Sequence, residues 1–247
     1  MPEAQDLTTA IAVEVAKQIP VSEAYGDALS PGMKQTGSLV EDLVKTLRLA
    51  LAPIQFTAAI QDRYAGFLNR SIRRVPGEQR VAPPPQILGP VIEAIKYEPE
   101  GSDIEDMFSE LLSRAFDKER VNEAHPSFPH LIKQLSADEA LILKIIAEST
   151  RSQKPMRTTI RHKLVDKRFY FETIENNDFP AGRLYFADNL QFYMEHLWAL
   201  NLAGIFEYRN QETLATGGRQ TGVREFREYR LTEIGTKFAA AVLPQLA

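Results

Sequence analysis

The sequence predicts a mainly α-helical protein with a small β-hairpin, made of an N-terminal helical bundle and a C-terminal winged-helix-like domain. Three observations predict this class: repeated helix-start motifs, apolar residues spaced three and four apart, and a final order of helix, hairpin and helix. We place the helical domain at residues 1–135 and the winged-helix-like domain at residues 136–247.

The composition is that of an ordinary globular chain. Its 247 residues are 44% hydrophobic and 25% charged, which is enough apolar content to form a core. The chain has 0 cysteines, which excludes disulfides and thiolate metal sites and fits a reducing compartment. The acidic start MPEAQDLTTA lacks the pattern of a secretion signal, and the most apolar stretch is shorter than the about 20 residues of a spanning helix. We therefore expect a cytoplasmic protein.

Three serines are followed by a glutamate three residues later, which is the spacing of a capping box. They are Ser38, Ser102 and Ser136, and the last is followed by Glu139. In this motif the serine hydroxyl accepts from an amide of the first turn, and the glutamate reaches back to the amide of the serine. The sequence therefore predicts a helix start at each of the three positions.

Residues 38–74 have helical periodicity with a break at Pro53, and they end in Arg70, Arg73 and Arg74. Two interpretations of this basic end stay open. It contacts an acidic surface, or it is a solvated face that complements the dipole of the helix C-terminus. A peripheral membrane contact through the same amphipathic segment is a third alternative.

The stretch DKERVNEAHPSFPHLIKQLSADEALIL, residues 117–143, holds His125, His130 and two prolines. Helical metal ligands lie three or four residues apart, so two histidines five apart with prolines between them do not form a zinc site. We interpret the stretch as a turn between helices and predict no catalytic residue, no metal and no cofactor. Enzymatic activity stays an open alternative, because active sites assemble from residues distant in sequence.

The C-terminal half changes character. RTTIRHKLV and RFYFETI predict short strands or an irregular excursion, and LYFADNLQFYMEHLWALNLAG returns to helical periodicity. IFEYR and EFREYRL, joined by the predicted loop NQETLATGGRQTGVR, predict a β-hairpin, and LTEIGTKFAAAVL predicts a last helix. In this winged-helix order the wing arginines would contact nucleic acid or a partner; they are Arg219, Arg224, Arg227 and Arg230. The predicted recognition helix ADNLQFYMEHLWALNL has no Lys or Arg, which disfavours DNA binding.

A series of motifs runs along the chain in the order AYGDALSPGMKQTG, LALAP, RVAPPPQILGP, MFSELLSRAFD, HPSFPHLIKQLSADEALIL and YRLTEIGTKF. This series resembles the bacterial abortive infection alpha family over residues 25–238. The resemblance implies a role in antiviral defence, in which phage is stopped by sacrificing or arresting the infected cell. The family supplies no catalytic residues to transfer to this chain.

The resemblance also raises a hypothesis about a structural polar turn formed by Asp117, His125, Ser136 and Glu139. In this hypothesis Asp117 accepts a hydrogen bond or ion pair from the His125 imidazole, or a hydrogen bond from a helix-start amide, and so locks the turn.

We expect a phage-resistance protein that acts by binding a phage or host protein. The alternative is a winged-helix DNA-binding transcriptional regulator. Contact with nucleic acid or with a membrane surface stays open, and so does homo-oligomerisation.

Overall fold

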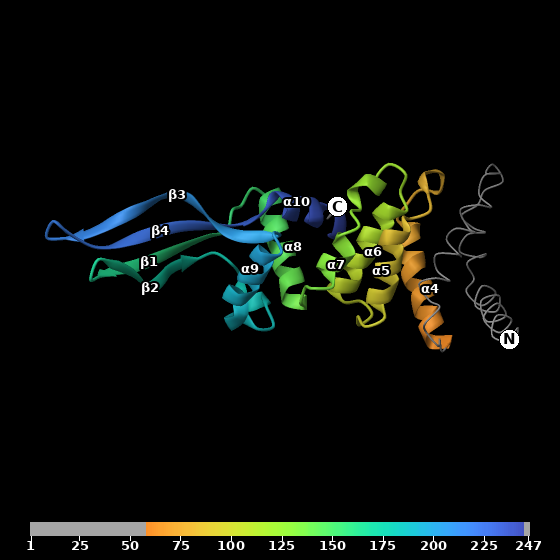
Figure 1. Cartoon of the computed structure of the whole chain (residues 1–247), viewed down its shortest axis with the longest axis horizontal. Helices are drawn as coiled ribbons and strands as arrows, with labels where there is room; N and C mark the ends of the chain where they lie inside the picture. Colours follow the sequence, from red (N-terminus) through yellow and green to blue (C-terminus); the bar gives the residue numbers. More distant parts are fainter. Residues whose placement is uncertain (1–57, 245–247) are drawn as a thin grey trace, which may run out of the picture. The chain divides into compact units, whose positions relative to one another are not determined.

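The computed structural model describes residues 58–244, which form two compact units. The first unit extends to Gln134 and includes the residues from Ala241 onward, and the second unit is Leu135–Ala240. Helices make up the first unit, whereas the second combines helices with a sheet (Figure 1). Segment 38–57, with the predicted helix start at Ser38, lies outside the described residues.

The first unit is built around one central helix. Its elements are α4 (Ala58–Arg73), η1 (Gly77–Gln79), α5 (Pro85–Ile95), α6 (Asp103–Ala115), η2 (Val121–Glu123) and α7 (Phe128–Ile132). Every residue of α6 from Met107 to Ala115 is buried, including the polar ones. Apolar side chains of α4 and α5, such as Phe67 and Leu88, complete this core. Buried polar groups on α6 therefore need partners inside the unit.

Arg114 of α6 is such a buried group, because its side chain is only 1% exposed, and all of its partners lie inside the unit. Its Nε donates to the Ala241 carbonyl (2.7 Å), Nη1 to the Glu123 carboxylate (2.7 Å) and Nη2 to Glu110 (3.0 Å). Burial raises the pKa of Glu110 above the ordinary carboxyl value, and the charge of Arg74 opposes that shift. The guanidinium thus joins its own helix and the nearby η2 to Ala241, which is 127 positions away in sequence.

The two predicted helix starts within the described residues are confirmed. Ser102 accepts from the Glu105 amide (3.1 Å) at the start of α6. Ser136 and Glu139 form the complete capping box, with the Ser136 amide donating to the Glu139 carboxylate at 2.7 Å. At Ser102 the glutamate instead accepts from the amide of Gly101, one residue earlier (2.7 Å).

The second unit contains α8 (Ala137–Arg151), β1 (Arg157–Val165), β2 (Arg168–Asn177), η3 (Ala181–Arg183), η4 (Ala187–Asn189), α9 (Leu190–Ala199), β3 (Ala203–Thr216), β4 (Arg219–Leu231) and α10 (Glu233–Val242) as far as Ala240. Its four strands form one antiparallel sheet in the order β2-β1-β4-β3. The prediction of a mainly α-helical protein with a small β-hairpin is therefore wrong.

The error has a physical cause. The two hairpins, β1–β2 and β3–β4, join through antiparallel pairing of β1 with β4, in which Thr159 faces Phe226. Such a pairing joins segments far apart in sequence, so local patterns do not reveal it. The segment predicted as a loop is instead strand up to Thr216 and again from Arg219, with only Gly217 and Gly218 between them at positive φ.

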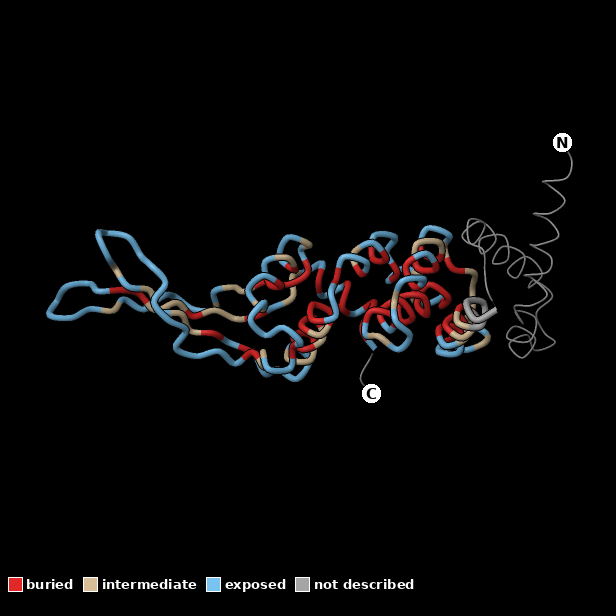
Figure 2. Tube along the Cα trace, turned by 90° about the horizontal axis from the view of Figure 1, so that it is seen from below, coloured by how far each residue is buried: buried red, intermediate tan, exposed pale blue. Residues whose placement is uncertain are grey.

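Residues of the sheet are more buried near the helices than near the turns of the two hairpins. Near the helices, Phe179 packs on Tyr229 with ring centroids 5.1 Å apart, and the Tyr229 hydroxyl donates to Asn177 at 3.2 Å. Away from the helices most residues are exposed, as Figure 2 shows by the pale blue trace of the two hairpins. All ten residues of β2 are exposed. The sheet therefore forms an arm whose free end is not part of the core.

Replacing Arg114 with Met should lower the free energy of unfolding by about 1.5–3 kcal/mol, because the Ala241 carbonyl would lose its charged donor and the buried Glu110 carboxylate would keep only Arg74 as a partner. Urea denaturation followed by circular dichroism measures this loss. Arg73→Met is the matched control, since Arg73 is exposed and forms no ion pair with residues 58–244; its effect should stay within about 0.5 kcal/mol. Equal stabilities of the two variants would contradict the role given to Arg114.

Candidate functional site

The four wing arginines do not form one basic surface. Arg224 donates to Glu175 (3.0 Å) and to Glu212 (3.0 Å), and its hydrogen bond lowers the pKa of Glu175. Arg227 pairs with Glu225 at 2.5 Å. Two of the four positive charges are therefore neutralised by carboxylates within the sheet.

Arg219 and Arg230 form no ion pair with the described residues, but they lie far apart. Arg219 begins β4 at the turn, and Arg230 lies near its other end, which at about 3.3 Å per residue is about 36 Å away. The guanidinium of Arg230 lies over the Phe206 ring, 4.8 Å from its centroid. A continuous phosphate-binding surface does not follow from this arrangement.

The arginines at the end of α4 and directly after it form ion pairs within the first unit. Arg70 pairs with Glu105 at 3.2 Å, and Arg74 pairs with Glu110 at 2.6 Å. Arg73 is exposed. Two of the three arginines predicted as an acidic-surface contact therefore bind carboxylates of α6.

The four residues of the predicted polar turn contact three different sets of partners, and Ser136 and Glu139 contact each other at the start of α8. Asp117, which is buried, accepts from the Glu119 amide at 2.9 Å and pairs through its backbone with Arg80. His125 is exposed, and its Nδ1 accepts from the Ser127 amide at 3.1 Å. Asp117 and His125 thus fix two separate turns by contacts with their own sequence neighbours.

Glu139 has a second partner that the sequence analysis missed. Its carboxylate is buried and caps Ser136 with one oxygen, while the other oxygen lies 2.5 Å from Nδ1 of His196 in α9. His196 in turn stacks on Phe192, with ring planes 14° apart and centroids at 6.4 Å. One buried carboxylate therefore fixes both the start of α8 and a side-chain stack on α9.

Asp138, next to Glu139, fixes a loop in the same way. Its side chain is buried, and its two oxygens accept from the backbone amides of Tyr185 (2.8 Å) and Phe186 (3.0 Å). An acidic residue in the first turn of a helix usually complements the dipole, so no local sequence pattern indicates this role. The carboxylate instead fixes the backbone that carries two aromatic side chains.

The aromatic platform consists of Tyr185, Phe186 and Phe192, which are 85%, 66% and 64% exposed. Large exposed apolar side chains on one short segment are typical of an interaction surface in a soluble protein. The backbone of the first two is held by Asp138, and the ring of the third stacks on the histidine that Glu139 holds. Such fixed aromatic groups lose little entropy on binding, which favours tight contact with a partner.

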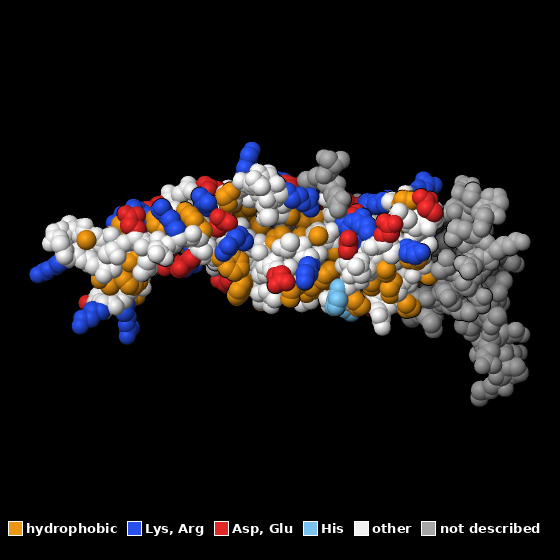
Figure 3. Space-filling view, turned by 90° about the horizontal axis from the view of Figure 1, so that it is seen from above, with side chains coloured by type: hydrophobic (Ala, Val, Ile, Leu, Met, Phe, Trp, Pro, Cys, Tyr) orange, Lys and Arg blue, Asp and Glu red, His pale blue; other side chains and the backbone are white. Residues whose placement is uncertain are grey.

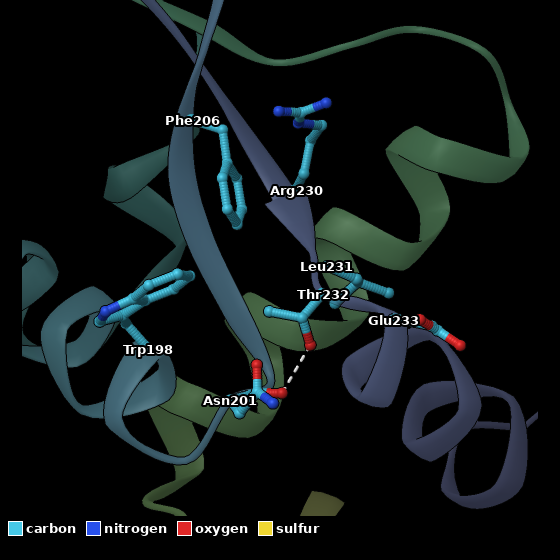
Figure 4. A pocket seen from close by; sticks show the side chains of 7 residues that line it. All are labelled: Trp198, Asn201, Phe206, Arg230, Leu231, Thr232 and Glu233. Atoms are coloured by element: carbon cyan, nitrogen blue, oxygen red, sulfur yellow. Dashed lines mark hydrogen bonds between the residues drawn. The ribbon is translucent and has the colours of Figure 1, made fainter.

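An open hollow of ≈ 410 Å³ lies where α9, the base of the sheet and the start of α10 meet (Figure 4). Its lining residues are Trp198, Asn201, Phe206, Arg230, Leu231, Thr232 and Glu233. Trp198 meets Phe206 edge to face at 5.5 Å, and the Thr232 hydroxyl donates to the Asn201 carbonyl. Its only carboxylate, Glu233, has no second acid or base beside it in the lining, so the hollow lacks the pair that acid–base catalysis uses.

Within residues 58–244, no cluster of three or more His, Asp or Glu side chains has the arrangement of a metal site. None of the helices in that part of the chain is both long and apolar enough to span a membrane.

Replacing Asp138 with Ala should leave the amides of Tyr185 and Phe186 without an acceptor and lower the free energy of unfolding by about 3 kcal/mol. Hydrogen exchange should show faster exchange at these two amides. Glu148→Ala on the same helix is the control, because the Glu148 side chain forms no hydrogen bond with the described residues and its loss should leave both amides protected. Unchanged exchange in Asp138→Ala would remove the carboxylate from this role.

Comparison with known proteins gives one result. The family model described as abortive infection alpha matches residues 56–242, a range that includes the first turn of α8 and the aromatic platform. No curated protein and no solved structure matches the chain, so the winged-helix-like assignment stays a prediction. The matched family suggests a defence role of the abortive-infection type. Because the match covers most of the sequence, this chain belongs to the abortive infection alpha family.

Proposed function

We propose that this protein acts in abortive-infection defence by binding a protein partner through the aromatic platform, without catalysing a reaction. The observation that carries the proposal is the use of two buried carboxylates, Asp138 and Glu139, to hold exposed rings in place. Buried charges are costly unless paired, so this use supports a function for the surface they position.

The charge around the platform supports a protein as the partner. Residues 183–199, which carry the platform, contain Asp188 and Glu195 but no Lys and no Arg other than Arg183, and helix α9 itself has neither Lys nor Arg. Phosphate groups would find few cations there, which disfavours nucleic acid. Exposed Tyr and Phe side chains with little charge are instead typical of the centre of a protein interface.

The same contacts support binding over catalysis. A general acid or base needs to reach a substrate. Asp138 instead accepts hydrogen bonds from two backbone amides, and Glu139 accepts from the Ser136 amide and contacts Nδ1 of His196. Both carboxylates are buried. Their hydrogen-bonding capacity is used inside the fold.

Cells carrying this gene should survive phage challenge at low phage dose and collapse at high dose, which is the population behaviour of abortive infection. The triple variant Tyr185→Ser, Phe186→Ser, Phe192→Ser should remove protection, because it deletes the apolar contact area and leaves Asp138 and Glu139 in place. The assay is colony survival with and without the gene at both doses, with protein levels and circular dichroism compared between variants.

Tyr97→Ser is the matched control, since Tyr97 is 75% exposed but lies in the first unit. It should keep full protection. A triple variant that is folded, expressed and still protective would overturn the role of the platform.

The DNA-binding alternative makes a different prediction. A regulator that contacts phosphates would shift duplex DNA in a gel, with affinity that falls steeply as salt rises, and Arg219→Ala with Arg230→Ala would abolish the shift. We expect no such salt-dependent shift, because the other two wing arginines are paired with carboxylates. A steep salt dependence that these two substitutions remove would favour the regulator.

A further inference from the structure

The free end of the β1–β2 hairpin exposes apolar side chains on both of its faces, and one of these faces also carries Lys163 and Arg168. Cross-strand partners share a face, so the register places Phe169 opposite Leu164 and Phe171 opposite His162 on one face. The edge-to-face contact of His162 with Phe171 agrees with this placement. Phe169 and Phe171 are 48% and 60% exposed.

The opposite face carries Val165 and Tyr170, because side chains alternate along a strand. These two residues are 42% and 47% exposed. Figure 3 shows hydrophobic side chains at the free end of the arm beside projecting Lys and Arg side chains. A flat partner that covers one face of the hairpin would leave the other face in water.

Cations without carboxylate partners surround this apolar end. Lys163, Lys167 and Arg168 are exposed and form no ion pair with the described part of the chain. Nearer the helices some cations of the sheet are paired with carboxylates, as in Arg157 with Glu228 and Arg161 with Glu172, and Arg230 lies over the Phe206 ring. Three unpaired cations therefore lie where these apolar side chains are exposed, against one exposed carboxylate, Asp166.

Two other occupants fit the hairpin less well. A single nucleic-acid strand needs several aromatic rings and cations along one face, because successive bases stack there. The face of Phe169 and Phe171 presents Leu164 and Ile174 beside them, whereas the face with Lys163 and Arg168 offers the ring of Tyr170 alone at this end of the hairpin. A second copy of the chain would pair along the free edge of β2. Two register shifts between β1 and β2 bend that edge and disfavour such pairing.

We propose that the β1–β2 hairpin binds the surface of an anionic lipid membrane. The exposed apolar side chains of both faces enter the boundary between headgroups and acyl chains. Lys163 and Arg168, which share a face with Val165 and Tyr170, and Lys167 at the turn extend to the phosphates. Because β2 has an unpaired edge, the hairpin stays at the hydrated headgroup level, where water satisfies the edge amides. This surface is separate from the aromatic platform and does not depend on the proposed protein partner.

The test uses the full-length protein and vesicles of phosphatidylglycerol with phosphatidylcholine, compared with vesicles of phosphatidylcholine alone. Flotation should recover the protein with the anionic vesicles only. Replacing Lys163, Lys167 and Arg168 with Gln should weaken binding about 100-fold, and Phe169→Ser with Phe171→Ser should weaken it at least about tenfold. Arg151→Gln and Tyr97→Ser are the matched exposed controls and should bind as the parent does.

A fluorescent reporter locates the contact independently of these losses. The chain has a single tryptophan, Trp198, so Trp198→Phe combined with Phe171→Trp places the only indole on the hairpin. Its emission should shift to shorter wavelength with anionic vesicles. An unshifted emission with bound vesicles, equal binding to neutral vesicles, or binding only to single-stranded nucleic acid would overturn the proposal.

Discussion

The first turn of α8 is the constraint on which the second unit depends. Ser136, Asp138 and Glu139 lie within four residues, and each carries out a different task there. Ser136 and Glu139 close the helix start, Asp138 holds the loop that leads to α9, and Glu139 also holds His196 of α9. Because buried carboxylates are destabilising without partners, these contacts fix a single arrangement of helix and loop.

The distribution of ion pairs decides which surfaces remain available. Arg70 and Arg74 in the first unit, and Arg224 and Arg227 in the second, are paired with glutamates. Their positive charge is neutralised locally, so it contributes little to long-range attraction of nucleic acid. Two groups of large apolar side chains remain exposed: the aromatic platform beside α9 and the end of the β1–β2 hairpin. Both favour a function based on binding.

The two surfaces differ in the partner that they fit. The platform is carried by a loop and helix fixed by buried groups, and it has little positive charge, which suits a protein partner. The hairpin is exposed on both faces and bordered by unpaired cations, which suits an anionic lipid surface. A defence protein that binds both would connect a protein partner with the membrane of the infected cell.

The sequence by itself determined the helix starts at Ser102 and Ser136, the apolar stripe of α6 and the family, because caps and helical periodicity are local and the motifs run along the chain. Only the tertiary structure decided that β1 pairs with β4, that Arg114 binds Ala241, and that Asp138 holds Tyr185 and Phe186. These contacts join residues tens of positions apart in sequence. No local pattern encodes such partners, since an aspartate in the first turn of a helix looks the same whether or not a distant amide reaches it.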